Sequence, residues 1–321
     1  MSKPIFLCIP GASHSPRVYE PLKAALLCYG YTVVPLGLPS VGGNPPTYDF
    51  TEDVAVIRNM ATHLVESGND VIVVMHSYGG LPGGEALQGL GKREREQRGL
   101  RGGVIRLVFI MSWMAREGFQ PSPRGDVSAL HPYMRPDLHH GNKQSDPQII
   151  ASLEFPPPPY NPHLLTIQQT GTTTINPKEA ASVFYNDMPA REAEYWASQL
   201  LPQSIGVFWS QTTFAAWRYI PSTYVLCGRD NCVSLAYGEM ILKDARDSTP
   251  NMIDAVERCD EAGHTVFLSQ VSLRDSMASA FGSPAPRDES LARARPPLLV
   301  GWRESPPLRP TNHSRAAPRT T

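Results

Sequence analysis

A serine, an aspartate and a histidine stand at positions where together they could activate a hydroxyl group. Ser77 ends the apolar run V-I-V-V-M-H-S of residues 71–77, and Gly79 and Gly80 follow it closely. This pattern is typical of a nucleophile elbow, in which a buried strand, a sharp turn and a helix follow one another. A serine hydroxyl is a weak nucleophile unless a base, an orienting acid and oxyanion donors assist it.

The elbow departs from the usual G-x-S-x-G pattern at its first glycine, where this chain has Met75. Residues two before and two after the serine face each other across the turn, so small side chains are favoured there. We expect the Met75 side chain to point away from the turn, or the turn to be slightly open. An ordinary strand–turn–helix would give a similar pattern.

The candidate acid and base follow later in the chain. Asp230 comes just after an apolar run, where an orienting carboxylate past the end of a strand belongs. His264 lies on a loop before a predicted final helix, which has an apolar face formed by Phe267, Val271, Ala278 and Phe281. This order predicts a triad of Ser77, His264 and Asp230, although each residue alone could be an ordinary turn or loop residue.

The loop after the first predicted strand reads P-G-A-S-H at residues 10–14. We expect the backbone N–H group of Ala12 to face the serine. The N–H group of Tyr78, directly after the nucleophile, would be the second oxyanion donor. Two such donors stabilise the negative oxygen of a tetrahedral intermediate.

The elements that must position these residues alternate between strands and helices. Apolar runs predict core strands at residues 5–9, 31–34, 71–75, 104–110 and 222–227. Helices are predicted at residues 18–27, 52–67 and 78–90. This alternation favours an α/β fold with an open, mostly parallel sheet covered on both faces.

Four segments are predicted along the chain. Residues 1–117 and 220–282 are the two parts of the core, and residues 118–219 are a cap inserted between core strands. In the cap, Asn176-Pro177 with Glu179 predicts a helix start, and residues 191–201 predict a second helix. Residues 283–321 are rich in Pro, Arg, Ala and Ser, which predicts a disordered tail.

Composition limits the classes of partner. The net charge of −1 suggests no nucleic acid partner, and 41% apolar residues suffice for a large core. The five cysteines show no CxxC spacing and predict reduced thiols in a cytoplasmic protein. No secretory signal or membrane span is predicted. His139 and His140 lie in a polar stretch that completes no metal site, and His76 is predicted to be a packed elbow histidine.

Together these residues resemble the α/β-hydrolase superfamily, and the likeness covers about residues 3–281. The closer likeness is to the branch with plant methylesterases and hydroxynitrile lyases, and to related fungal hydrolases with the same kind of domain. Pro10-Gly11-Ala12 matches the H-G-A oxyanion loop of that branch with Pro in place of His, and residues 36–40 resemble its loop after the second strand. Residues 224–269 resemble its D-x-x-(I/V)-P … G-x-H-x-x-x-L-S pattern, with Ser234 in place of Pro.

The resemblance implies an α/β-hydrolase fold and a serine hydrolase without a cofactor or metal. It implies a small, apolar ester, lactone or thioester as substrate, by analogy one from fungal secondary metabolism or a xenobiotic. Ser13, Trp113 and Met114 would line the substrate pocket, although ordinary packing under the cap explains Trp113 and Met114 equally well. Glu117 is an alternative acid, since some members place the acid after that strand.

Two alternatives remain open at this point. One is a lyase, cyclase or isomerase that uses Ser77 and His264 as acid–base groups on the same fold. Cyanohydrin cleavage is disfavoured, because the hydroxynitrile lyases carry a lysine directly after the catalytic histidine and this chain has Thr265. The other alternative is a ligand-binding protein that has lost turnover. The oligomeric state is not predicted.

Overall fold

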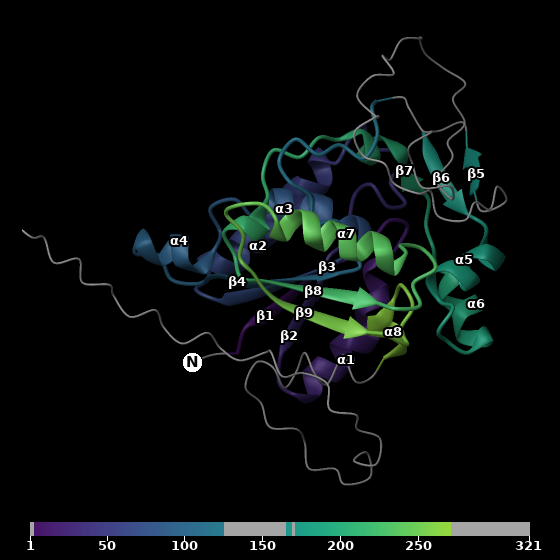
Figure 1. Cartoon of the computed structure of the whole chain (residues 1–321), viewed down its shortest axis with the longest axis horizontal. Coiled ribbons are helices and arrows are strands. Elements are labelled where there is room, and N and C mark those ends of the chain that lie inside the picture. The colour runs from purple at the N-terminus through teal and green to yellow at the C-terminus, as the bar shows by residue number, and fades with distance from the viewer. Residues whose placement is uncertain (1–2, 125–164, 169–170, 271–321) are drawn as a thin grey trace, which may run out of the picture.

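The computed structural model describes residues 3–124, 165–168 and 171–270. The larger sheet of this part of the chain has six parallel strands in the order β2-β1-β3-β4-β8-β9 (Figure 1). They are β1 (Ile5–Ile9), β2 (Thr32–Pro35), β3 (Asp70–His76), β4 (Gly103–Ile110), β8 (Ser222–Cys227) and β9 (Ile253–Cys259). Parallel strands end at the same edge, so the loops after β1, β3, β4 and β8 gather there.

Helices cover both faces of this sheet. α2 (Thr51–Glu66), α3 (Gly80–Ala86) and α7 (Leu235–Arg246) lie on one face, and α1 (Glu20–Cys28) and α8 (Val266–Ser269) on the other (Figure 1). The short α4 (Lys92–Gln97) precedes β4. This arrangement confirms the predicted α/β fold with a mostly parallel sheet.

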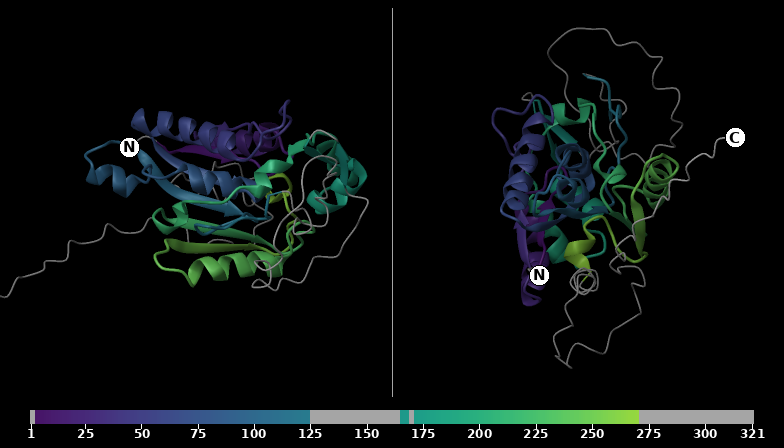
Figure 2. Two further views of the ribbon diagram at one scale, coloured as in Figure 1. Left: turned by 90° about the horizontal axis from the view of Figure 1, so that it is seen from above. Right: turned by 90° about the vertical axis from the view of Figure 1, so that its left-hand side faces the viewer.

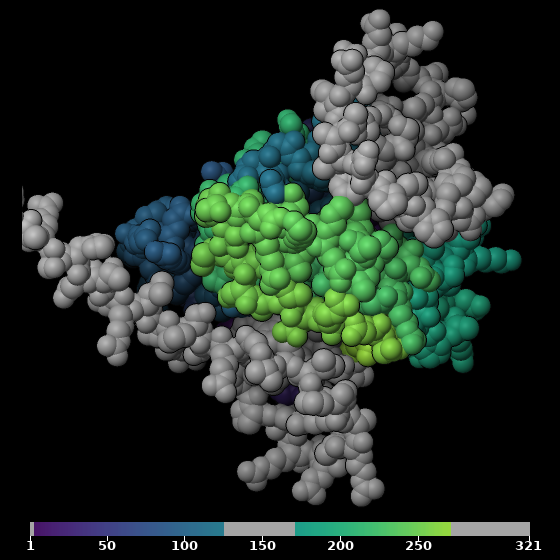
Figure 3. Space-filling view, viewed as in Figure 1, coloured from purple at the N-terminus to yellow at the C-terminus, as the bar shows by residue number. Residues whose placement is uncertain are grey.

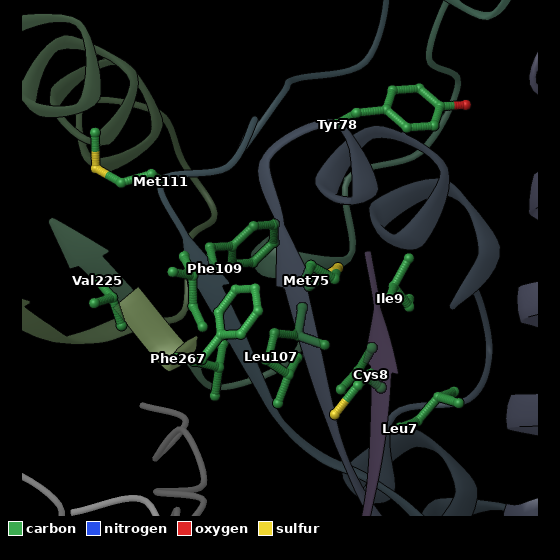
Figure 4. Close-up of a cluster of buried hydrophobic side chains, with 14 of the residues drawn as sticks. Leu7, Cys8, Ile9, Met75, Tyr78, Leu107, Phe109, Met111, Val225 and Phe267 are labelled. Carbon is green, nitrogen blue, oxygen red and sulfur yellow. The ribbon is translucent and has the colours of Figure 1, made fainter. Parts of the chain in front are cut away.

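The core explains why the strand sequences are continuously apolar. Residues 71–75 of β3 are completely buried, because helices cover this central strand from both sides. Figure 4 shows side chains of β1, β3, β4 and β8 in one buried cluster with Phe267 of α8. Burying each such side chain is worth about 1.5–3 kcal/mol. α8 is thereby anchored to the sheet, directly after the loop that holds His264.

The predicted elements differ from the structure mainly at their ends. The predicted helix 78–90 is a 3₁₀ turn (Ser77–Gly79) followed by α3, which ends at Ala86. Two glycines inside α3 weaken it, and Gly89 has a φ of 78° that no helix continues through. The edge strand β9 was not predicted, since its I-D-A-V-E-R-C sequence is only half buried and mixes charged with apolar residues.

An insertion separates β4 from β8, although these two strands are neighbours in the sheet. It contains a second, antiparallel sheet of β5 (Leu165–Gln168), β6 (Thr172–Ile175) and β7 (Gln203–Ser204), with α5 (Pro177–Phe184) and α6 (Ala190–Ser198). Figures 1 and 2 show these elements beyond the carboxyl ends of the strands. As predicted, the Asn176 side chain caps α5, accepting the Lys178 N–H group (3.0 Å).

Several predictions fall outside the described residues. These are His139 and His140, the continuation of the last helix beyond residue 270, and the tail from residue 283. Among the described residues, no helix combines the length and apolar character that crossing a bilayer requires. None of the five cysteines forms a disulfide, as predicted.

We expect Gly80→Ala to destabilise the fold, because the added methyl carbon would lie 2.3 Å from the Trp113 carbonyl oxygen. Overpacking of this kind costs about 1–3 kcal/mol. Gly84→Ala in the same helix is the matched control, since its methyl group would meet no atom within 4 Å. That control should gain about 0.5–1 kcal/mol from helix propensity. Urea unfolding followed by circular dichroism measures both, and equal stabilities of the two variants would contradict the assigned packing.

Candidate active site

Ser77 occupies a strained turn at the end of β3. Its φ is 49°, in the left-handed region that side chains other than glycine rarely adopt. The turn fits because Gly79 lies against the loop after β1, where a methyl carbon would approach the Pro10 carbonyl oxygen to 2.6 Å. Met75 replaces the usual first glycine, and its sulfur packs against Gly83 of α3. A methyl carbon on Gly83 would lie 2.6 Å from the Met75 sulfur. The Met75 side chain therefore extends toward α3, as the first of the two expected arrangements requires.

The loop after β1 packs directly on this elbow. A methyl carbon on Gly11 would lie 2.9 Å from the Ser77 Cβ atom, so only glycine allows the approach. Ala12, Ser77 and Tyr78 then line one pocket. The structure thus brings together the serine and both residues whose N–H groups were predicted as oxyanion donors.

Asp230 and His264 form a buried hydrogen-bonded pair. The distance between Asp230 Oδ2 and His264 Nδ1 is 2.7 Å, and both residues are almost fully buried. The second carboxylate oxygen, Oδ1, accepts the backbone N–H groups of Cys232 and Val233, each at 2.7 Å. These bonds compensate the carboxylate for its lost hydration and fix its orientation.

The pKa of His264 is set by opposing effects. Burial alone lowers this pKa, but the Asp230 carboxylate, together with its hydrogen bond and the Cys232 side chain, outweighs burial and raises it. The ring also packs against His76, with centroids 4.5 Å apart. An imidazole with a raised pKa and its Nδ1 held by a carboxylate can take a proton at Nε2 and stabilise the resulting charge.

The pocket encloses about 500 Å³ together with its opening to solvent. Its apolar lining comes from the core and from the insertion: Met111, Trp113, Ile175, Phe184, Phe208, Val233 and Ile241. Trp113 therefore lies where it was predicted. Ser13 and Met114 are buried but do not line the pocket. The Ser13 backbone is bound to the insertion, since its N–H group donates to Gln203 Oε1 (2.9 Å) and its carbonyl accepts a hydrogen bond from the Leu201 N–H group (2.9 Å).

His76, the other histidine beside Ser77, and Glu117, the alternative acid, both have structural partners. His76 is buried, and its Nε2 contacts the His264 carbonyl oxygen at 3.0 Å, so it supports the loop as a packed elbow histidine. Burial lowers its pKa well below the usual value. Glu117 accepts from Arg218 Nε at 2.9 Å and does not line the pocket.

Two of the pocket residues that were missed at the sequence level support the predicted groups. His14 donates from Nδ1 to the Ala12 carbonyl (2.7 Å), and burial lowers its pKa to about 4, so it is a neutral support of the loop after β1. The Cys232 side chain hydrogen-bonds to His264. The available signal for His14 was its place in the P-G-A-S-H loop, and the signal for Cys232 was its position two residues after Asp230. Within the described chain, Asp230, Cys232 and His264 also form a set of donors that could hold a metal ion.

The parallel sheet, the strained serine at a strand end and the inserted segment define an α/β-hydrolase. This chain belongs to the alpha/beta hydrolase family, whose sequence pattern matches residues 6–275. Two similar proteins are themselves named as hydrolases, and this chain is a hydrolase of the same family.

Three similar proteins illustrate this relationship. "Probable hydrolase R7" from a Phoma species is 33% identical over 267 residues, covering 82% of this chain and 92% of that protein. "Alpha/beta hydrolase nvfD" from Aspergillus novofumigatus is 28% identical over 273 residues, covering 85% and 94%. The crystal structure of the methylesterase MES16 from Arabidopsis has a TM-score of 0.59 at 15% identity, covering 85% of this chain and 97% of that chain, and it shares the fold.

We expect a histidine titration followed by NMR to give His264 a pKa above the usual value of about 6.5. Asp230→Asn should lower this pKa, because burial then acts without the carboxylate. A raised native pKa stabilises the fold fully below the unfolded-state value of about 6.5, and this stability is lost as the pH rises through the native pKa. The urea midpoint should therefore fall over this window in the wild type and much less in the variant. If the urea midpoint changed with pH in the same way in both proteins, the pairing of His264 with Asp230 would be contradicted.

Proposed function

We propose that this protein is a serine hydrolase that cleaves a carboxylic ester, lactone or thioester of a small apolar molecule. One observation carries the proposal: a serine in a left-handed backbone conformation and the histidine of a buried histidine–aspartate pair line the same apolar pocket. Strained backbone of this kind persists where the surrounding structure enforces it, often at functional sites.

In the proposed reaction, His264 Nε2 takes the proton of the Ser77 hydroxyl as its oxygen attacks the substrate carbonyl carbon. The N–H groups of Ala12 and Tyr78 hold the negative oxygen of the tetrahedral intermediate. His264 then gives the proton to the leaving alcohol or thiol, and an acyl-enzyme remains. Water then attacks the acyl carbon as His264 takes its proton, and His264 returns a proton to Ser77 as the carboxylic acid leaves. In both halves of the reaction Asp230 fixes the imidazole tautomer and stabilises its cation.

The lining of the pocket supports an uncharged substrate. Among its lining residues there is no Lys, Arg, Asp or Glu, whereas aromatic and aliphatic side chains are abundant. Away from His264, a charged substrate group would lose its hydration there without gaining a charged partner. We propose that the insertion is a cap that supplies part of the specificity, since Ile175, Phe184 and Phe208 come from it. His264 must be neutral to accept the proton, so its raised pKa implies rates that increase with pH.

Ser77→Ala should abolish hydrolysis and fluorophosphonate labelling while leaving the fold intact. Loss of a triad serine in a well-studied protease costs about a million-fold in kcat. A panel of p-nitrophenyl esters of graded chain length, together with lactones, supplies the substrate for the assay. Circular dichroism and thermal unfolding provide the folding control. A variant that keeps more than about a thousandth of the wild-type rate would refute the nucleophile assignment.

Asp230→Asn should lower kcat by about ten-thousand-fold, because the amide favours the wrong imidazole tautomer. Glu117→Gln is the matched control, since it alters only a partly exposed ion pair with Arg218, whose worth is about 0–1 kcal/mol. It should leave kcat nearly unchanged. The reverse ranking of the two variants in the same ester assay would move the acid to the end of β4.

A further inference from the structure

One short segment of the insertion contacts three loops of the site. This segment, the α5 corner, comprises residues 182–187 at the end of α5 and in the turn after it. Its Tyr185 hydroxyl lies 2.9 Å from His14 Nε2, which accepts the bond because Nδ1 of the same ring donates to the Ala12 carbonyl. The corner is therefore linked to the oxyanion loop. Figure 3 shows the teal surface of this region against the green and yellow-green surface of the chain beyond β8.

The same corner holds the loop that carries Asp230. Asn186 donates from Nδ2 to the Arg229 carbonyl at 2.8 Å. In return, Asn231 donates from Nδ2 to the Ser182 carbonyl at 2.9 Å. Both backbone neighbours of the acid are thereby tied to the insertion.

Asp187 holds the loop of His264 from both sides. Its Oδ2 accepts the Gly263 N–H group at 2.7 Å and the Ser269 hydroxyl at 2.5 Å. Gly263 directly precedes His264, and Ser269 lies in α8 after it. One carboxylate oxygen thus joins the start of the loop to the helix that ends it.

The fit at this point is close. A methyl carbon on Gly263 would lie 2.8 Å from Asp187 Oδ1, so the loop backbone rests on the carboxylate. The Phe184 ring lies 5.6 Å from the His264 ring, and the Phe184 carbonyl accepts the Thr265 hydroxyl at 2.6 Å. The insertion therefore contacts the imidazole ring of His264 and the residues on either side of it, Gly263 and Thr265.

We propose that Asp187 is a positioning residue that holds the His264 loop in the geometry in which the imidazole reaches both Asp230 and the pocket. The inference rests on the proposed serine hydrolase function. A hydrogen bond that a carboxylate accepts is among the stronger hydrogen bonds, and a misplacement of about 1 Å in a catalytic group can cost about a hundred-fold in rate. Asp187 does not line the pocket, so its contribution belongs to kcat and not to KM.

The test compares Asp187→Ala with Asp187→Asn on a p-nitrophenyl ester. The alanine variant should lower kcat by about 10- to 100-fold with KM within about twofold of wild type. The asparagine variant should recover most of the rate, since an amide oxygen can accept from Gly263 and Ser269. Glu194→Ala, which removes an exposed carboxylate of α6, is the control and should change neither constant.

A second readout does not depend on turnover. The proton in the His264–Asp230 hydrogen bond should give a low-field NMR resonance, which Asp187→Ala should shift or broaden and Asp187→Asn should keep. Wild-type kcat and an unchanged resonance in Asp187→Ala would overturn the proposal. Failure of the proposed function is distinguishable, because the wild type would then neither hydrolyse esters nor take the fluorophosphonate label.

If circular dichroism shows that Asp187→Ala does not fold correctly, Ser269→Ala is the variant that tests the proposal. This variant removes one of the two donors and keeps the Gly263 bond. It should lower kcat by about 2- to 10-fold at constant KM, the size of one net hydrogen bond. An unchanged kcat together with an unchanged resonance in Ser269→Ala would overturn the positioning role.

Discussion

The parallel direction of six strands is the constraint on which the site depends. Because β1, β3 and β8 end at one edge, the residues after them meet there although they lie far apart in the chain. Ile9 pairs with Met75 in the register of the sheet, which sets the loop after β1 beside the turn of Ser77. The close approach of Gly11 to Ser77 completes this contact. The sheet thus assembles the groups, and the loops then need only local adjustment.

Three buried polar residues behind Ser77 compensate one another for their lost hydration. Behind the elbow, the Tyr78 hydroxyl donates to Asp53 Oδ2 at 2.6 Å, and the same carboxylate accepts the Ser40 hydroxyl and N–H group. Burial raises the pKa of Asp53, while these bonds oppose the rise. A satisfied network of this kind fixes one conformation, because any unpaired member would carry the full cost of its lost hydration. Tyr78, which lines the pocket, is therefore held through its hydroxyl group.

The insertion has two roles in this arrangement. It contributes apolar side chains to the pocket, and the α5 corner ties together the loops of Ala12, Asp230 and His264. One element therefore contributes both to the pocket lining and to the support of the loops that carry the candidate residues.

The sequence by itself determined the elements and the residues with local patterns. Apolar runs of β-branched residues predicted five of the six main strands, and the elbow, Asp230 and His264 followed from their places at strand ends. Met75 was flagged as an anomaly, but only the packing of its sulfur on Gly83 explained how the turn accommodates it. The only local signal of His14 and Cys232 is their place in the loops of Ala12 and Asp230, and Asp187 carries none. Their roles come from contacts such as that between Tyr185 and His14, 171 residues apart, which only the tertiary structure decides because packing, and not local propensity, brings such residues together.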